Sequence, residues 1–307
     1  MEINTKKKLA ASLSICSNIV LTVSKIVLGI ISGSLSIISE AVHSASDFVA
    51  SVLTFFSVIK SSKPADKDHP YGHGKYEDLS GFIEGLLIIF AALFIIYKAS
   101  AKIILSQSVE FESTPGIIVM CAAVVLNFLV STYLFKVSKE SNSISLYADG
   151  EHLRVDVYSS LGVLAGLILI KLTGYTLLDP IIAILIAVFI YKTGYSISKR
   201  SVQNLLDHSL PIDDIEKIKG IVKNLSVNAK LKRNGIRARQ VGPTKDIDLI
   251  LQFPEDTSIC ECHKICDEIE GQIQTVFQNS SISIHPEPIC YSKKCNKCCD
   301  KQHKNQI

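Results

Sequence analysis

The long apolar segments in the first two thirds of the chain limit its fold more than any other feature. The chain has 307 residues, 48% of them hydrophobic, and a mean hydropathy of +0.31. A helix needs about 20 apolar residues to cross the hydrocarbon core of a bilayer. The segments that meet this length are 9–33, 36–59, 80–105, 114–137, 146–172 and 177–198. We therefore expect a membrane α-helical bundle of six transmembrane helices in residues 1–206.

Basic residues predict the orientation of these helices. They precede the first segment, lie in the second and fourth connections, and follow the sixth segment: Lys6, Lys7, Lys8, Lys60, Lys63, Lys67, Lys75, Lys136, Lys139, Lys199 and Arg200. The other connections are short or acidic and contain few basic residues. Loops that stay in the cytoplasm carry the excess of lysine and arginine. We expect an integral protein of the cell membrane with both termini in the cytoplasm, surrounded by the lipid bilayer.

The pattern changes after Leu206 to that of a soluble domain. Residues 212–225 have acids early and lysines late, as the dipole of a helix favours. Apolar residues alternate in the segment DIDLILQF, which predicts a half-buried strand. The expected order αββαβ indicates a cytosolic α+β domain in residues 207–289, of the kind found in ferredoxins and metallochaperones. Residues 290–307 form a separate cysteine-rich tail.

Two H-x-x-x-D pairs lie inside apolar segments. They are His43 with Asp47 and His152 with Asp156. The spacing i, i+4 places both side chains of a pair on one face of a helix. Ionisable groups at membrane depth are costly and indicate ion pathways. Two imidazoles and two carboxylates facing each other would form a tetrahedral site for a divalent metal such as zinc.

The chemistry of such a site links metal binding to protons. Histidine titrates near neutral pH, and metal ligands must be deprotonated, so protons and metal compete for the site. An exchanger needs this competition and two alternating conformations. The structural alternative is that the histidines only stabilise packing between helices, which is less expected for two matching pairs than for one.

The chain resembles the cation diffusion facilitator family over nearly its whole length. The resemblance rests on the motifs SGSLSIISEAVHSASD, ADGEHLRVDVYSS, DHPYGHGKYE, LLDP, IRARQVG and ISIHPEP. It implies a homodimeric, proton-driven antiporter that exports divalent metal by alternating access. The transport site would be His43, Asp47, His152 and Asp156. The resemblance favours zinc, sometimes cobalt, while iron, cadmium and manganese stay open.

The resemblance also implies a second metal site in the loop after the second helix. The matching residues are Asp66, His69 and His73, and three ligands leave a fourth position for water. The alternative is a turn held by glycines, with solvated histidines. Lys75 resembles a lysine that pairs with an aspartate after the sixth helix, here Asp207, as a dimer hinge.

A third metal site is implied in the cytosolic domain. His263, His285 and Glu287 match positions that bind metal between protomers. Two further positions of the fullest pattern are Asn234 and Ile250 here, so a complete binuclear site is in doubt. The resemblance thus implies bound zinc in structural or regulatory roles besides transported zinc.

The cysteines near the C-terminus are candidate auxiliary ligands. They are Cys260, Cys262, Cys266, Cys290, Cys295, Cys298 and Cys299. Thiolates at C-x-x-C spacing bind zinc or copper(I). The alternative for the tail is a disordered terminus with reducible thiols.

Two other function classes, an intramembrane enzyme and a channel, fit the sequence less well. An intramembrane metallohydrolase would need an H-E-x-x-H motif or its equivalent, and the sequence contains none. We therefore do not expect an enzyme. A metal-gated channel would line a continuous pore, whereas a four-ligand site at depth favours alternating access. No nucleic-acid-binding motif occurs, so no nucleic-acid partner is expected.

Overall fold

The computed structural model describes residues 3–32, 35–105, 114–173, 178–225 and 229–289. The chain divides after Leu206 into two compact units. Near several helix ends the structure describes the backbone but not the side chains. The cysteine-rich tail, residues 290–307, also lies outside it.

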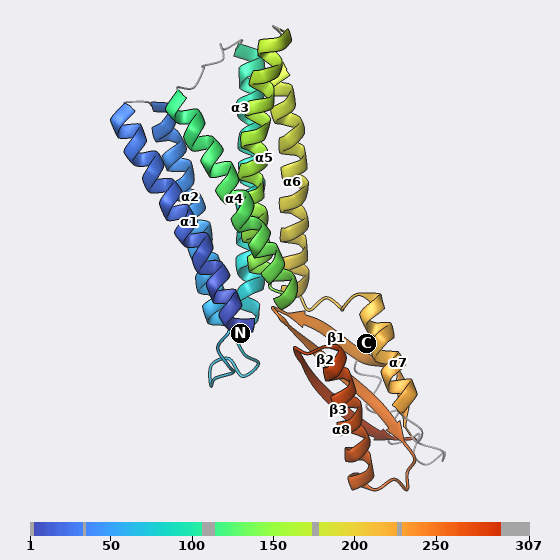
Figure 1. Cartoon of the computed structure of the whole chain (residues 1–307). Coiled ribbons are helices and arrows are strands. Elements are labelled where there is room, and N and C mark those ends of the chain that lie inside the picture. The colour runs from blue at the N-terminus through green and yellow to red at the C-terminus, as the bar shows by residue number, and fades with distance from the viewer. Residues whose placement is uncertain (1–2, 33–34, 106–113, 174–177, 226–228, 290–307) are drawn as a thin grey trace. The chain divides into compact units, whose positions relative to one another are not determined.

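Six long helices form the first unit (Figure 1). They are α1 (Ile3–Ser32), α2 (Leu35–Ser61), α3 (Lys75–Leu105), α4 (Thr114–Ser141), α5 (Ile144–Thr173) and α6 (Leu178–Leu205). Among the described residues, α1, α3, α4 and α6 are long and apolar enough to cross a membrane. The other two helices, α2 and α5, contain the ionisable residues singled out in the sequence. The first unit is therefore a helical membrane domain.

The start of α3 differs from the sequence-based boundary at residue 80. The helix begins at Lys75, and its first turn includes Glu77 and Asp78, both fully buried. The predicted segment begins after both acids, because the apolar stretch long enough to cross a bilayer begins at residue 80. Here partners satisfy them, since Lys7 on α1 forms an ion pair with Glu77 and the side-chain amide of Asn204 donates to Asp78.

Glycines allow α3 and α6 to approach closely. A Cβ added to Gly194 would lie 2.9 Å from the backbone oxygen of Gly85, and one added to Gly85 would lie 2.8 Å from the backbone nitrogen of Ser198. Small residues at such contacts are typical of helix packing in membranes, where close backbone approach provides the attraction.

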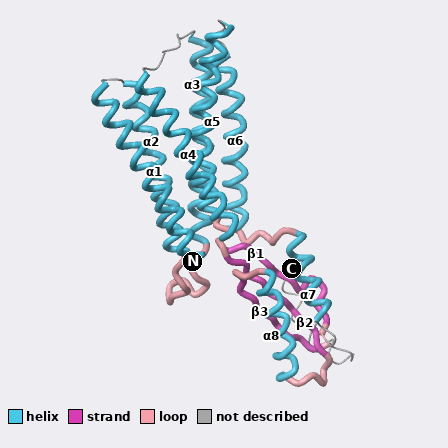
Figure 2. The backbone as a smooth tube through the Cα atoms, viewed as in Figure 1, coloured by secondary structure: helices cyan, strands magenta, loops and turns pink. Residues whose placement is uncertain are grey.

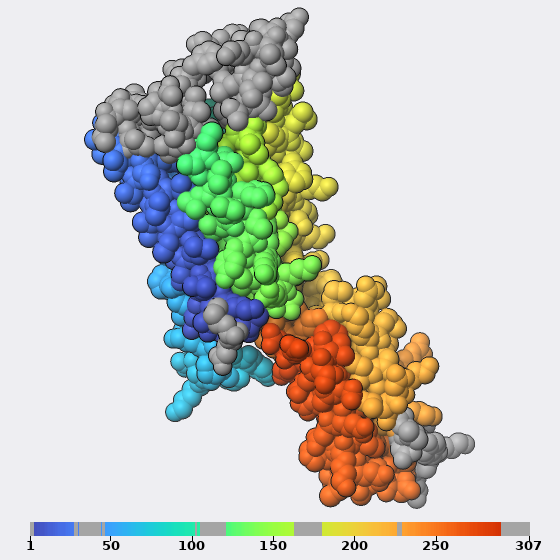
Figure 3. Space-filling view, viewed as in Figure 1, coloured from blue at the N-terminus to red at the C-terminus, as the bar shows by residue number. Residues whose placement is uncertain are grey.

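Large apolar side chains cover the outside of the helical unit. Phe90 on α3 and Phe189 on α6 are 64% and 57% exposed, and many other large apolar side chains on these helices are exposed as well. The side chains of α1 and α4 form much of one face of this unit (Figure 3). Exposed apolar surface of this extent fits contact with lipid.

The second unit is a layer of two helices on a three-stranded sheet (Figure 2). Its elements are α7 (Ile212–Leu225), β1 (Lys230–Val241), β2 (Thr244–Phe253), α8 (Ile259–Val276) and β3 (Ser280–Pro288). The sheet order is β1-β2-β3, with β2 antiparallel to β1 and parallel to β3. The predicted order αββαβ is confirmed. The parallel pair is possible because α8 forms the crossover between β2 and β3.

Apolar residues at alternate positions of β2 form the centre of the hydrophobic core of this unit. Ile247, Leu249, Leu251 and Phe253 are at most 2% exposed and pack against buried residues of α7 and α8. Successive side chains of a strand point to opposite faces, so alternate residues share the covered face.

Candidate metal-binding sites

Helices α2 and α5 bring together three of the four predicted transport ligands. Asp47 on α2 and His152 on α5 are 5% and 6% exposed, and Nε2 of His152 lies 3.2 Å from Oδ1 of Asp47. Asp156 lies one turn further along α5, and one ligand atom from each of the three lies within 4.8 Å of the others. Ligands around a tetrahedral zinc ion lie about 3.4 Å apart, given bonds of about 2.1 Å. The group is therefore close to the spacing that a metal ion requires.

The donor set suits a borderline divalent metal. One imidazole nitrogen and two carboxylates would offset the charge of the ion and leave a fourth position for another ligand. His43 lies one turn before Asp47 on α2, but its side chain is outside the described part of the structure. Its place in the ligand set remains a prediction.

Polar side chains that sequence reasoning did not single out surround this group. The Asn18 side-chain amide on α1 donates to the backbone oxygen of Asp47 at 3.5 Å and to Oγ of Ser51 at 2.5 Å. The Ser51 hydroxyl also lies 3.2 Å from the Asp47 backbone oxygen. The sequence does contain a sign of these contacts. Asn18 and Ser51 are polar residues within apolar segments, and Ser51 follows Asp47 by four residues, one helical turn.

The loop between α2 and α3 brings its three predicted ligands together. Asp66 lies 3.4 Å from Nδ1 of His69 and 3.3 Å from Nε2 of His73. One ligand atom from each of the three lies within 4.8 Å of the others. Gly72 has φ 84°, a left-handed conformation that favours glycine, and its N–H donates to the His69 carbonyl. This turn places both histidines beside Asp66.

The electrostatics of the loop favour a cation. The backbone N–H of His69 donates to Oδ1 of Asp66, and this bond lowers the pKa of the Asp66 carboxyl. His73 is only 2% exposed, and its Nδ1 lies 3.2 Å from the Pro64 carbonyl oxygen. That contact fixes the ring and leaves Nε2, which has no hydrogen-bond partner among the described residues, facing Asp66. Such a contact to the second ring nitrogen is typical of metal-ligating histidine.

The three predicted ligands of the cytosolic domain do not meet within one chain. His263 on α8 is exposed and lies 3.4 Å from Asp267, while His285 on β3 is exposed as well. Glu287 forms an ion pair with Lys232 at 2.9 Å. Among the described residues, these side chains form no metal-ligand group. The resemblance implies a site shared between protomers, and that site remains a prediction.

The two other positions of this pattern have structural roles in the sheet. Asn234 has φ 59° where the pairing of β1 with β2 shifts, and a Cβ on the following Gly235 would lie 2.9 Å from the Ile250 backbone oxygen. Ile250 pairs with His285 of β3 in the sheet register. Its hydrocarbon side chain offers no metal ligand.

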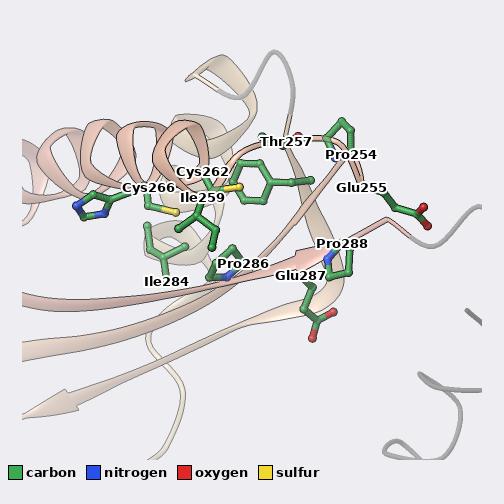
Figure 4. A pocket seen from close by; sticks show the side chains of 12 residues that line it. Pro254, Glu255, Thr257, Ile259, Cys262, Cys266, Ile284, Pro286, Glu287 and Pro288 are labelled. Atoms are coloured by element: carbon green, nitrogen blue, oxygen red, sulfur yellow. The ribbon is translucent and has the colours of Figure 1, made fainter.

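Two of the predicted auxiliary cysteines line a cavity of about 410 Å³ in the cytosolic domain. Cys262 and Cys266 lie one turn apart on α8, and Figure 4 shows the Glu287 carboxylate pointing away from both sulfur atoms. Burial raises the pKa of the Cys266 thiol, which disfavours the thiolate that binds metal. Cys260 is exposed. The tail cysteines, Cys290, Cys295, Cys298 and Cys299, lie outside the described residues.

The predicted hinge pair of Lys75 and Asp207 spans the boundary between the two units. Within the first unit, Nζ of Lys75 donates to the Leu205 backbone oxygen at 3.3 Å. Within the second unit, Asp207 forms an ion pair with Arg239 at 3.0 Å. The pair itself remains a prediction.

Two family models match consecutive parts of the chain. A cation efflux transmembrane domain matches residues 11–206. The cytoplasmic domain of cation efflux proteins, under the name ZT_dimer, matches residues 210–289. The second match implies homodimerisation and places the C-terminal domain in the cytoplasm.

Curated relatives are similar along most of their length. An uncharacterized transporter of Methanocaldococcus jannaschii is 32% identical over 89% of this chain and 95% of its own. The cation-efflux pump FieF of Shewanella oneidensis is 29% identical over 92% of this chain and 94% of its own. The manganese efflux system protein MneS of Bacillus subtilis is 28% identical over 92% of this chain and 96% of its own. The chain therefore belongs to the cation diffusion facilitator (cation efflux) family and is an integral membrane transporter of divalent metal cations with a cytoplasmic C-terminal domain, not an enzyme.

Proposed function

We propose that this protein is a proton-coupled antiporter that exports zinc from the cytoplasm by alternating access. The observation that carries the proposal is the buried group of Asp47, His152 and Asp156 between α2 and α5. His43 completes the transport site as the fourth ligand. Ionisable residues inside a helical membrane domain are costly, and they mark substrate and ion pathways.

Zinc is proposed because of the nitrogen ligands. Imidazole suits zinc and cobalt, whereas oxygen ligands suit manganese. A relative named as a manganese efflux protein keeps manganese among the alternatives. Iron and cadmium are further ions to be compared in the same assay.

Protons are proposed as the counter-ion because metal and protons compete for the same donors. Histidine changes its charge near neutral pH, and both carboxylates must be ionised to bind metal. Proton binding after the metal leaves would return the group to a state of low charge, which favours the opposite conformation.

The proposed topology has six spans, with both termini in the cytoplasm of a homodimer in the cell membrane. The helices α2 and α5 contain 27 and 30 residues, enough to cross a bilayer, although they carry the proposed ligands. With six spans, an even number, the N-terminus would lie on the same side as the cytoplasmic C-terminal domain. The loop ligands Asp66, His69 and His73 bind a second, structural zinc ion in this proposal.

Proteoliposomes containing the purified dimer test the proposal. With a pH indicator and a zinc indicator inside, we expect zinc movement in one direction and proton movement in the other. The Asp156→Ala variant should abolish both movements while the dimer persists. The matched control is Asp248→Ala, which removes an exposed aspartate on β2 and should leave both unchanged.

The same assay separates the metal-gated channel, which remains the alternative. A channel would conduct zinc down its gradient without a pH difference and without moving protons. Zinc flux that ignores the pH difference would overturn the antiporter proposal. Transport by Asp156→Ala at the wild-type rate would overturn the proposed site.

A further inference from the structure

One face of α2 carries polar side chains from the candidate metal-ligand group to the end of the helix, and the buried Val58 interrupts them one turn before Ser61. Asp47, Ser51, Thr54 and Ser61 have the spacing i, i+4, i+7 and i+14, which places them along one face. Asp47, Ser51 and Thr54 are at most 5% exposed, and Ser61 is partly buried. At a rise of 1.5 Å per residue, this line of residues is about 20 Å long.

The line leads toward the cytoplasmic end of the bundle. At the end of α2, the Ser61 hydroxyl donates to Glu77 in the first turn of α3 at 2.7 Å. The neighbouring Lys75 donates to the backbone oxygen of Leu205, the last residue of α6. The chain continues from α6 directly into the cytoplasmic domain. The ends of α2 and α6 therefore lie on the cytoplasmic side.

Two of these side chains contact buried carboxyl groups on other helices. The Ser51 hydroxyl lies 3.3 Å from Oδ1 of Asp149, which is one turn before His152 on α5. The Thr54 hydroxyl donates to Oε1 of Glu84 on α3, and the Ser80 hydroxyl donates to the same oxygen at 3.0 Å. Asp149 and Glu84 are both 0% exposed.

Each carboxyl group has a second oxygen without a partner. Oδ2 of Asp149 and Oε2 of Glu84 are buried and make no hydrogen bond to any described residue. Neither group forms an ion pair with a lysine or arginine in the described part of the chain. Glu77, nearer the cytoplasmic end, differs because Lys7 neutralises it.

Other charged groups act on these carboxyl groups. Glu84 interacts electrostatically with Asp149 and His152, and Asp149 interacts with His152. The metal-ligand group adds Asp47 from α2 and Asp156 from α5. Lys7 on α1 is engaged by Glu77 at the end of the bundle.

Burial and repulsion together favour a bound proton. A carboxylate removed from water without a cation costs several kcal/mol, and two neighbouring carboxylates cannot both ionise easily. A divalent ion held by His152 and its partners would add positive charge one turn from Asp149. Arrival of the metal would then favour breaking a carboxyl O–H bond and releasing the proton to water, with the Ser51 and Thr54 hydroxyls in hydrogen-bond contact with the two carboxyl groups.

We propose that Glu84 and Asp149 hold protons that are exchanged for the metal ion, in addition to the protons that compete with the metal at its ligands. This inference rests on the proposed antiport function and deepens it, because it adds proton-carrying groups beside the metal ligands. The proton leaves as metal binds from the cytoplasm, and the carboxylates regain it after the metal leaves on the other side.

The test measures protons moved per zinc ion in proteoliposomes with the full-length dimer. Glu84→Gln and Asp149→Asn keep the shape of each side chain but cannot release a proton. We expect both variants to bind zinc nearly as well as wild type and to move fewer protons per zinc ion. The dependence of the transport rate on pH should shift as well.

Two controls separate proton exchange from a structural role. Ser80→Ala removes one hydrogen bond to Glu84 and keeps the carboxyl group, so the proton-to-zinc ratio should stay at the wild-type value. Glu84→Asp restores a carboxyl group and should recover much of the ratio lost in Glu84→Gln. A structural role would instead lower zinc binding and rate equally without changing the ratio.

Three results would contradict parts of this account. Wild-type ratios and pH profiles in both variants would overturn the assignment of Glu84 and Asp149. Loss of zinc binding in Asp149→Asn would make Asp149 a metal ligand and also overturn it. Zinc transport by the wild type without any proton movement would instead overturn the proposed antiport function.

Discussion

Nε2 of His152 lies 3.2 Å from Oδ1 of Asp47, so the candidate metal-ligand group of Asp47, His152 and Asp156 joins α2 to α5. Asp156 adds a carboxylate from the same face of α5. A metal ion that replaces the contact between His152 and Asp47 would bind both helices at once. The occupancy of this group can therefore influence how α2 and α5 pack, which is what alternating access requires.

His43 should tune the choice of metal. The change His43→Asp adds an oxygen ligand one turn before Asp47 and removes a nitrogen ligand. Because manganese prefers oxygen and zinc accepts imidazole readily, we expect the ratio of manganese to zinc transport to rise. Competition assays in proteoliposomes with zinc, cobalt and manganese give this ratio. Unchanged relative rates would show that His43 does not contribute to metal choice.

The buried ion pair of Lys7 and Glu77 should stabilise the end of the bundle at which α1 and α3 begin. Lys7 is 1% exposed and Glu77 is 0% exposed, and Ser61 and Ser143 also donate to Glu77. Removing one member of a buried pair leaves an uncompensated charge and costs about 3–5 kcal/mol. We expect Lys7→Met to lower the melting temperature of the detergent-solubilised dimer.

The double variant Lys7→Met/Glu77→Gln is the matched control for this pair. It removes both charges, so we expect its melting temperature to recover most of the loss. A single variant that melts like the wild type would show that the pair does not stabilise the bundle.

Removing the carboxylate of the loop should remove one bound metal ion. Asp66→Asn keeps the shape of the side chain but weakens its affinity for a cation, so about one zinc ion per chain should be lost. Metal analysis of the purified dimer after dialysis measures this number. Asp68→Asn, in the same loop, is the control and should retain the wild-type number. Equal zinc content in Asp66→Asn and wild type would contradict the loop site.

The pH dependence of the Asp66 carboxyl follows from its lowered pKa. Its contribution to loop stability is present above the ordinary aspartate pKa of about 3.9 and is lost as the pH falls through the lowered pKa. Protonation of Asp66 therefore should not limit zinc binding at mildly acidic pH. The NMR signal of this carboxyl, assigned by its absence in Asp66→Asn, should titrate below the ordinary range.

The cysteine-rich tail should be dispensable for transport but not for metal content. Removal of residues 290–307 leaves β3 intact, together with the 2.6 Å hydrogen bond between the Ile289 N–H and the Phe253 carbonyl. We expect the maximal zinc transport rate to stay near the wild-type value. The number of zinc ions bound per chain should fall, because the tail contains four thiols that can bind zinc.

A full-length variant with serine at all four tail cysteines separates thiol chemistry from the length of the tail. It should match the truncated protein in bound zinc. Loss of transport at saturating zinc in the truncated protein, with the dimer intact, would place the tail in the transport mechanism.

Sequence patterns by themselves determined the local structure of this protein. Apolar length predicted the helical segments, because a membrane span requires a long apolar helix. Alternation predicted that Ile247, Leu249, Leu251 and Phe253 would share the buried face of β2, as they do. The spacing of His152 and Asp156 predicted a common helix face, because the period of a helix is local geometry.

Only the tertiary structure decided which separate segments meet. The residue pattern of one segment does not show which other segment it contacts in the fold. Sequence reasoning therefore could not pair Lys7 with Glu77 or Ser51 with Asp149. It also placed Glu77 outside α3, since the apolar stretch long enough to cross a bilayer begins at residue 80. The packing of α1, α2, α3 and α5 neutralises Glu77 and leaves Glu84 without a cation among the described residues. The difference between a structural charge and a candidate proton carrier therefore arises from tertiary contacts.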